Sequence, residues 1–513
     1  MADEYTANVN QKGYEGSKVL AEMATSTLNN PGQGIIRVLS KGMNGIALTK
    51  IPAGYYGIVH SASGDPRIRD LGDYAESMVH RLVTQAKQMR ATPLSMSNVI
   101  DSNKGDIAVL RNIFETVVYW SGIEKFAIVN GENGIIDRVE EASIVGTMLS
   151  IAPKYNYMKE LGEKRSVRII KGDDAYILFD PQDKLVYMNS DGNGTKPEMN
   201  ERALMNAMMK NKKFIDKINI SKKLREYNMF GKLVFDTVAM DADDAGKIGA
   251  DIIAISAIAE TRGNIPYWAL WALGHQAKKI TRKGIEYIIQ REDVGNRIRG
   301  YKDDAPAINM NVTAVSLLDE KYINNPLKPY PGQHLIAIRS PRPTPRSNGL
   351  TNKRKIMREW LGDEWHNTSE GRHMLEYLVE PSTIFYFAFK ELLDHELATS
   401  FYHMSGGAYD SKLARPLAKH DLYVSIDNLF PPDPREILLY QKSGSTLRDT
   451  YKKWPMGTEA FITTDNPDEA MAVLRSLGYD SRDVGTLEST GRKGLTLIAY
   501  DGENISFDGT GSD

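Results

Sequence analysis

The sequence contains no cysteine, and this absence excludes several kinds of chemistry. Disulfide bonds, zinc sites built from thiolates and cysteine nucleophiles all need that side chain. The chain also lacks a Walker A motif and a complete Gly-x-Gly-x-x-Gly fingerprint, and its nine histidines show no zinc-protease spacing. Any chemistry must therefore be carried by other residues.

Positive and negative charges are also nearly balanced in the sequence. The formal net charge is −2, which argues against a general affinity for nucleic acid or for anionic membranes. The longest apolar runs, such as 252–259, are too short to span a bilayer, and the polar, acidic N-terminus is unlike a signal peptide. We expect a cytoplasmic protein with neither nucleic acid nor membrane as its partner.

The 513 residues predict two to four domains, because so long a chain exceeds a single hydrophobic core. Short β-rich runs such as 55–59, 126–129 and 185–188 alternate with helical periodicities at 73–89 and 107–121. This mixture predicts the α+β or α/β class.

A glycine-containing loop, Asp191-Gly192-Asn-Gly194-Thr195-Lys196, follows the apolar run 185–188. Glycines let a backbone approach a polyphosphate closely, and a carboxylate beside them can hold the Mg²⁺ that accompanies ATP. The same residues are typical of an ordinary hairpin turn. Taken alone, the loop leaves both interpretations open.

Acidic residues recur at two further places. Asp173 and Asp174 open a strand, and Asp241, Asp243 and Asp244 are predicted to lie at a helix start. Mg²⁺ in nucleotide sites takes one or two carboxylates beside the phosphates. Each acidic group alone is as typical of helix starts and turns, but three within one domain favour a metal site.

A basic segment and a histidine segment follow in the C-terminal part. The segment 339–351 contains Arg346-Ser347-Asn348-Gly349 before a predicted helix, a pattern that suits an anion site or a solvated basic loop. His403 precedes a Gly-Gly pair, and it suits either proton transfer or a structural role.

The chain also contains a faint internal repeat. The segment 55–65 is similar to 185–192, and the helix that begins at Asp73 is similar to the one that begins at Asp236. In this alignment His80 and Arg81 stand where the second copy has Asp243 and Asp244. The second copy can hold a metal there and the first cannot.

In their order these motifs resemble the phosphoribosylformylglycinamidine cyclo-ligase (aminoimidazole ribonucleotide synthetase) family, within the superfamily that includes thiamine-monophosphate kinase and selenophosphate synthetase. The loop 189–196 is similar to the family's Gly-Thr-Asp-Gly-Val-Gly-Thr-Lys, and 347–349 matches its Ser-Asn-Gly. The segment 403–407 is similar to its His-Leu-Thr-Gly-Gly, and 381–386 to its Pro-Thr-Arg-Ile-Tyr.

The resemblance implies an α+β fold in which a barrel-forming N-terminal domain is present twice, as a pseudo-dimer, followed by one C-terminal α/β domain. Residues 1–155 would be a degenerate copy of the N-terminal domain and 163–325 a more complete one. Residues 330–507 would form the C-terminal domain and 508–513 a tail. The pseudo-dimer implies that the protein is monomeric.

The resemblance also implies an ATP-dependent ligase with a small ribonucleotide substrate, which closes the imidazole ring in purine biosynthesis. Lys196, His403 and Asp191 are the implied catalytic residues. The predicted ligands are grouped by what they would bind: for ATP, Asp191, Gly192, Gly194, Thr195, Lys196, Gly42, Gly45 and Glu132; for the substrate phosphate, Arg346, Ser347, Asn348 and Gly349; for Mg²⁺, Asp173, Asp174, Asp191, Asp243 and Asp244.

The sequence departs from the family at four places. The second copy lacks the long glycine-rich N-terminal segment, and Gly172-Asp-Asp-Ala175 is more similar to the thiamine-monophosphate kinase branch. Gln290-Arg291-Glu292 replaces Gly-Gly-Glu, and Arg346 replaces the histidine before Ser-Asn-Gly. Two alternatives therefore stay open: a small-molecule phosphate kinase of the thiamine-monophosphate type, and a non-catalytic structural or regulatory member of the fold.

Overall fold

The computed structural model describes residues 15–32, 34–38, 47–103, 106–135, 141–161, 166–171, 175–210, 229–262, 267–293, 307–342, 344–346 and 349–510. Contacts divide the chain into two compact units. The two-sheet unit comprises Ala7–Pro197 and Ala250–Asn324, and the C-terminal unit contains Glu198–Gly249 and Asn325–Asp513. Residues Glu198–Gly249 therefore belong to the C-terminal unit, although the strands before and after them in the chain belong to the two-sheet unit. The predicted limits of the three domains stay predictions.

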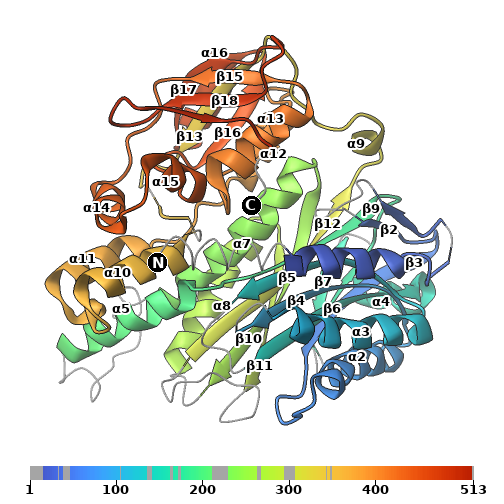
Figure 1. Cartoon of the computed structure of the whole chain (residues 1–513). Helices are drawn as coiled ribbons and strands as arrows, with labels where there is room; N and C mark the ends of the chain where they lie inside the picture. Colours follow the sequence, from blue (N-terminus) through green and yellow to red (C-terminus); the bar gives the residue numbers. More distant parts are fainter. Residues whose placement is uncertain are drawn as a thin grey trace. The chain divides into compact units, whose positions relative to one another are not determined.

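The first sheet of the two-sheet unit has the strand order β5-β4-β6-β3-β8-β7 (Figure 1). Only β4 and β5 run parallel among its neighbours. Its strands are β3 (Tyr55–Ser63), β4 (Thr92–Ser102), β5 (Ala127–Ile135), β6 (Ala142–Pro153), β7 (Val167–Ile170) and β8 (Tyr176–Phe179), and the short η1 (Lys154–Asn156) and α4 (Met158–Leu161) follow β6.

Helices α2 (Leu71–Gln88) and α3 (Ile107–Glu124) lie side by side on one face of this sheet, as Figure 1 shows. Asp70 caps α2 by accepting a hydrogen bond from the backbone N–H of Asp73. Met78 and Leu82 lie one turn apart and are fully buried. Both helices predicted from periodicity in this region are confirmed.

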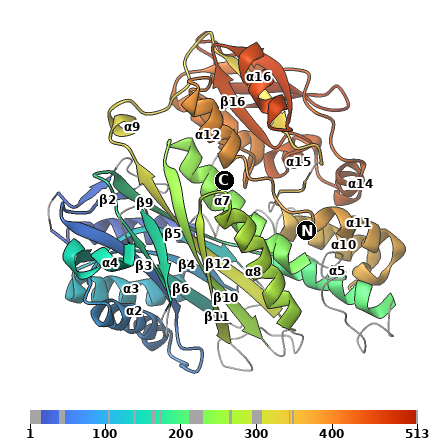
Figure 2. The ribbon, with the colours of Figure 1, turned by 180° about the vertical axis from the view of Figure 1, so that it is seen from behind.

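The second sheet has the order β1-β2-β9-β12-β10-β11, with β10 and β11 parallel and α8 against β11 (Figure 2). Its strands are β1 (Ile36–Val38), β2 (Ala47–Lys50), β9 (Leu185–Gly192), β10 (Asp251–Arg262), β11 (Glu286–Asp293) and β12 (Ala307–Leu318), and its helices are α8 (Tyr267–Thr281) and α9 (Lys321–Asn324).

The two sheets share one arrangement of four strands. The order β5-β4-β6-β3 in the first sheet corresponds to β11-β10-β12-β9 in the second, with the same parallel and antiparallel pairs. The flanking hairpins are exchanged: β1–β2 precede β3 in the chain but pair with β9, whereas β7–β8 precede β9 but pair with β3. Each sheet is therefore completed by a hairpin that precedes, along the chain, the four shared strands of the other sheet.

An apolar core lies between the two sheets. Val59 and Leu149 of the first sheet pack in one cluster with Met188 and Val315 of the second. Among the described residues, no strand of one sheet pairs with a strand of the other. The α+β class is therefore confirmed, whereas the predicted barrel is not.

The C-terminal unit contains a four-stranded sheet, β14-β16-β13-β17, and a three-stranded sheet, β15-β18-β19. The strands are β13 (His334–Arg339), β14 (Ser400–His403), β15 (Tyr423–Ile426), β16 (Ala460–Thr464), β17 (Asp480–Thr486), β18 (Gly494–Ile498) and β19 (Asn504–Phe507). The helical elements are α5 (Lys196–Lys210, whose first two residues belong to the two-sheet unit), α7 (Met229–Lys247), α10 (Leu350–Leu361), η3 (Trp365–Asn367), α11 (Ser369–Leu378), α12 (Tyr386–Asp394), η4 (Tyr409–Ala414), α13 (Arg415–Lys419), α14 (Pro434–Ser443), α15 (Leu447–Lys453) and α16 (Pro467–Ser476). Within the described ranges, no helix is both long enough and apolar enough to cross a membrane.

Candidate functional site

Helix α7 begins at Met229 and not at Asp236, so the prediction that Asp241, Asp243 and Asp244 lie at a helix start is wrong, and they lie near its C-terminal end. The helix presents two buried carboxylates to the turn that precedes α12. Asp236 and Asp243 are seven residues apart, which places them on one face of the helix, and both are fully buried. Asp236 Oδ1 accepts a hydrogen bond from the backbone N–H of Ser382 (2.8 Å), and Asp243 Oδ1 accepts one from the backbone N–H of Tyr386 (2.8 Å). This face of α7 therefore holds the 382–386 turn by its backbone.

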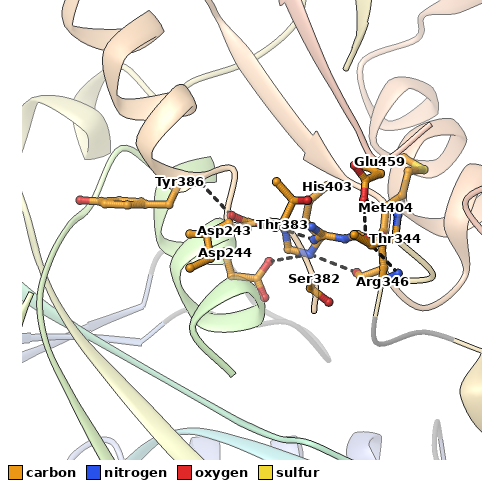
Figure 3. A network of polar contacts seen from close by, with 12 residues as sticks. Asp243, Asp244, Thr344, Arg346, Ser382, Thr383, Tyr386, His403, Met404 and Glu459 are labelled. Carbon is orange, nitrogen blue, oxygen red and sulfur yellow. Dashed lines mark hydrogen bonds and ion pairs between the residues drawn. The ribbon is translucent and has the colours of Figure 1, made fainter. Parts of the chain in front are cut away.

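Arg346 forms the centre of a polar network in the C-terminal unit (Figure 3). Its Nη2 lies 3.0 Å from Asp243 Oδ2, its Nη1 donates to the carbonyl of Thr383 at 2.5 Å, and its Nε donates to the carbonyl of Met404 at 3.3 Å. Only 2% of the side chain is exposed. Burial raises the pKa of Asp243 to about 6, against the opposing charge of Arg346.

His403 lies between the two adjacent acids of α7. Its Nδ1 is 3.8 Å from Asp243 Oδ2, its Nε2 is 3.7 Å from Asp244 Oδ1, and Nε2 also contacts Ser405 Oγ at 3.1 Å. Burial, reinforced by the charge of Lys247, lowers the pKa of His403 well below 6.5. The imidazole is therefore neutral at neutral pH, and a neutral imidazole can accept a proton.

Asp244 is the more accessible acid of the pair, with 39% of its side chain exposed. Lys247 Nζ lies 2.5 Å from its Oδ1. Against the cost of desolvation, the charges of Lys247 and Lys412 hold the pKa of Asp244 below its usual range. Asp244 is thus a carboxylate whose ionised form is favoured by the charges of two lysines.

The predicted basic loop is organised by a carboxylate of the protein itself. Glu459 accepts hydrogen bonds from the backbone N–H of Ser340 (2.7 Å), from that of Thr344 (3.3 Å) and from the Thr344 hydroxyl, and it is 1% exposed. Gly349 follows with φ +67°, and a Cβ there would lie 2.6 Å from Trp454 Cδ1. These loop N–H groups are therefore already taken by Glu459, whereas Ser347 and Asn348 lie outside the described residues.

A glycine turn leads from His403 into a π-helix. Gly407 has φ +81° and Ala408 has φ +35°, after which η4 carries Lys412. A π-helix is rare and is found mostly at functional sites. The turn contributes both His403 and a lysine to the surroundings of Asp244.

The Asp191–Lys196 loop, in the two-sheet unit, joins strand β9 to helix α5 and not to a second strand. Asp191 Oδ1 accepts a hydrogen bond from the backbone N–H of Gly192 at 2.7 Å, and Gly194 has φ +54°. A Cβ on Gly192 would lie 2.8 Å from Asn311 Oδ1. The hairpin interpretation is wrong, because a strand–turn–helix forms here, the arrangement that phosphate-binding loops use.

The structure brings together Asp243, Asp244, Arg346 and His403 within the C-terminal unit. Asp191, Gly192, Gly194, Thr195, Lys196 and the exposed Glu132 belong to the two-sheet unit. Gly42, Gly45, Asp173 and Asp174 lie outside the described residues. In the part of the chain that the structure describes, no three His, Asp or Glu side chains gather as metal ligands.

Three contributors to the network were not predicted from the sequence: Glu459, Lys247 and the carbonyl of Thr383. The seven-residue spacing of Asp236 and Asp243 was the available signal for a buried acidic face. Nothing local marks Glu459, because its partners are 115 residues or more away in the sequence.

Comparison with known proteins agrees with the motifs. The chain is 23% identical over 277 residues to the phosphoribosylformylglycinamidine cyclo-ligase of Pyrococcus furiosus, covering 53% of this chain and 76% of that protein. It is 24% identical over 289 residues to the Thermococcus gammatolerans enzyme of the same name, covering 55% and 79%. No family model matches the chain. The resemblance to this family is confirmed, at low identity and over about half of the chain.

Similarity to solved structures is weaker. The hydrogenase maturation protein HypE of E. coli gives a TM-score of 0.38 at 16% identity, covering 54% of this chain and 79% of HypE. Thiamine-monophosphate kinase from Stenotrophomonas maltophilia gives 0.40 at 13%, covering 66% and 93%. Scores of this size carry no argument about function.

Proposed function

We propose that this chain is an ATP-dependent enzyme that converts formylglycinamidine ribonucleotide to aminoimidazole ribonucleotide. The observation that carries the proposal is the strand–turn–helix at Asp191–Lys196, in a chain whose relatives are named as cyclo-ligases of this reaction. Its backbone geometry suits a polyphosphate, since Gly194 has a positive φ and the next helix begins at Lys196.

In the proposed reaction ATP phosphorylates the amide oxygen of the substrate, and an internal nitrogen then attacks the same carbon and expels phosphate. Lys196 was predicted to pair with phosphate oxygens, and that role stays a proposal, because the structure buries its side chain completely. His403 was predicted as a proton-transfer group, and that role stays a proposal. Burial keeps its imidazole neutral and able to accept a proton, but the same burial lowers its pKa and makes it a weak base. Arg346, Ser347, Asn348 and Gly349 were predicted to bind the substrate phosphate. That role stays a proposal for Ser347, Asn348 and Gly349, whereas Arg346 is buried and donates to three acceptors of the protein itself.

Magnesium fits part of the predicted donor set. Asp191 of the two-sheet unit and Asp244 of the C-terminal unit each have a partly exposed carboxylate. Either one, considered by itself, suits the ion that travels with ATP, which needs only one or two carboxylates beside the phosphates. Both oxygens of Asp243, by contrast, already accept hydrogen bonds. When bound, Mg²⁺ would neutralise charge on the transferring phosphoryl group.

The kinase alternative is a small-molecule phosphate kinase of the thiamine-monophosphate type. It is favoured by the Gly-Asp-Asp-Ala sequence at 172–175, which is similar to that branch. The two enzymes differ in the fate of the γ-phosphoryl group. The cyclo-ligase releases free phosphate with ADP, whereas the kinase leaves it on the product.

We also propose that the two-sheet unit is a duplicated pair of N-terminal domains. The matching strand orders and the exchanged hairpins support this proposal. A fused pair needs no second chain, so analytical ultracentrifugation should give the mass of one chain. A dimer that persists at nanomolar concentration would contradict the fused pair.

The central experiment is an ADP-release assay with formylglycinamidine ribonucleotide, with free phosphate measured in parallel. We expect Asp191→Asn to lower kcat/KM by about 10-fold or more, because the loop loses its charge. Asp65→Asn is the matched control at the end of β3, where Asp65 pairs with the exposed Arg67, and it should leave the rate unchanged. Equal ADP release by the wild type and Asp191→Asn would refute the nucleotide role of the loop, and no ADP release by either would leave the non-catalytic alternative.

A further inference from the structure

We propose that Asp243 and Arg346 form a buried ion pair that positions His403 and Asp244, and that neither residue of the pair binds metal or phosphate directly. The catalytic part of this inference rests on the proposed function. Its structural part does not, because the pair is defined by the contacts of the C-terminal unit alone.

The pair is out of water and most of its hydrogen-bonding groups are occupied. Asp243 accepts hydrogen bonds from Tyr386 N on one oxygen and from Arg346 Nη2 on the other, and it is fully buried. Three of the five N–H groups of the guanidinium donate to three different protein acceptors, and only 2% of the Arg346 side chain is exposed. A ligand that displaced one member of the pair would leave the other charge buried and unpaired.

The second argument is the position of the functional groups in the sequence. Asp244 directly follows Asp243 on α7, so fixing the Asp243 side chain fixes the rotation of the helix and hence the direction of Asp244. His403 directly precedes Met404, whose carbonyl accepts the Arg346 Nε hydrogen bond. Arg346 therefore contacts Asp243, which precedes Asp244, and Met404, which follows His403, as Figure 3 shows.

The third argument is backbone strain. Arg346 has φ +48°, in the left-handed region that non-glycine residues seldom adopt. Such a conformation persists only where the surroundings over-determine it, and strained residues of this kind cluster at functional sites. Here the three hydrogen bonds donated by the Arg346 side chain hold the residue in this conformation. A lysine could not form all three, because it lacks the planar guanidinium group.

The test is a double-mutant cycle with Asp243→Asn, Arg346→Gln and the double variant. We expect each single variant to lower the melting temperature by about 4 °C or more and the double variant to lower it by little more than one single change, because the pair acts as a unit. Hydrogen exchange in the peptides that cover 382–386 and 403–408 should accelerate in both singles. Asp394→Asn, in the exposed pair with Lys390 on α12, is the control and should change neither readout.

The kinetic part compares these variants with Asp244→Asn. We expect Asp243→Asn and Arg346→Gln to lower kcat about 10-fold with KM for the ribonucleotide and the Mg²⁺ requirement within about twofold of wild type. Asp244→Asn should raise the Mg²⁺ requirement about 10-fold with an unchanged melting temperature.

Three results would overturn the inference: additive losses of melting temperature, a raised Mg²⁺ requirement in Asp243→Asn, or a raised KM at constant kcat in Arg346→Gln. If the wild type neither binds nor hydrolyses Mg-ATP, the proposed function fails. The melting temperatures and exchange rates then still decide whether the pair exists and orders both segments.

Discussion

Thr313 Oγ1 donates a hydrogen bond of 2.7 Å to Thr147 Oγ1, where the two six-stranded sheets face each other. Thr147 stands opposite Ser61 on its own sheet, and Thr313 stands opposite Ser190 on the other. Two further hydroxyl hydrogen bonds join the sheets at equivalent positions. Ser61 of the first sheet bonds Ser256 of the second, and Ser190 of the second bonds Ser97 of the first. Residues at equivalent positions of the two sheets thus exchange equivalent hydrogen bonds.

This chain of hydroxyls leads to the first stability prediction. Thr147→Val or Thr313→Val should lower the free energy of unfolding by about 1–3 kcal/mol, because each change removes two buried hydrogen bonds, one to the other threonine and one to a serine of the same sheet. The double variant should cost less than the sum, since the hydrogen bond between Thr147 and Thr313 can be lost only once. Urea unfolding measures all three.

Thr496→Val is the control for this series, because Thr496 forms a similar hydroxyl pair with Ser506 at an exposed position. It should change the free energy of unfolding by less than about 0.5 kcal/mol. Fully additive costs in the double variant would mean that Thr147 and Thr313 do not depend on each other.

The sequence predicts local structure well where one periodicity dominates. The buried stripe of Met78 and Leu82 predicted α2, and Leu110 and Ile113 predicted α3. The sequence could not predict the exchange of hairpins, because β1–β2 and β7–β8 carry no signal that names their partner strand. Strand β2 pairs with β9 and not with β3. This choice depends on which apolar face each hairpin covers in the folded protein.

The candidate site shows the same limit. His403, Asp243 and Asp244 were predicted from motifs, and they lie together. The pairing of Asp243 with Arg346 was not predicted, since the two are 103 positions apart and each suits a ligand role when considered alone. Burial decides between these roles, and burial is a property of the packed unit.

Two glycines with left-handed backbones allow a second prediction. Gly349 has φ +67° and faces Trp454, whereas Gly194 has φ +54° and no atom within 4 Å of its Cβ position. Gly194→Ala should cost about 1 kcal/mol from backbone strain alone. Gly349→Ala should cost at least about 2 kcal/mol, because the added methyl group also collides with a fully buried indole. Thermal unfolding of the two variants compares them, and equal losses would mean that Trp454 moves aside freely.

The last prediction concerns two buried acids at the junction of the sheets. Asp101 accepts a hydrogen bond from Asn309 Nδ2 of the other sheet at 3.0 Å, and Glu260 accepts one from Ser143 Oγ at 2.6 Å, again at matched positions. Burial raises the pKa of Asp101 to about 6 and that of Glu260 to about 7, and the nearby charge of Glu292, which pairs with Arg81, also raises the latter.

A raised carboxyl pKa stabilises the fold below the pKa of the unfolded chain, and this contribution is lost as the pH rises through the folded value. The wild type should therefore lose about 2 kcal/mol or more of its free energy of unfolding between pH 5 and 8 from Glu260 alone. Glu260→Gln, which keeps a neutral acceptor for Ser143, should remove most of that loss, whereas Glu359→Gln on the exposed face of α10 should not. Urea unfolding from pH 5 to 8 gives the three profiles. If the wild type and Glu260→Gln profiles run parallel, Glu260 is ionised throughout this range, and the sheet junction tolerates its charge.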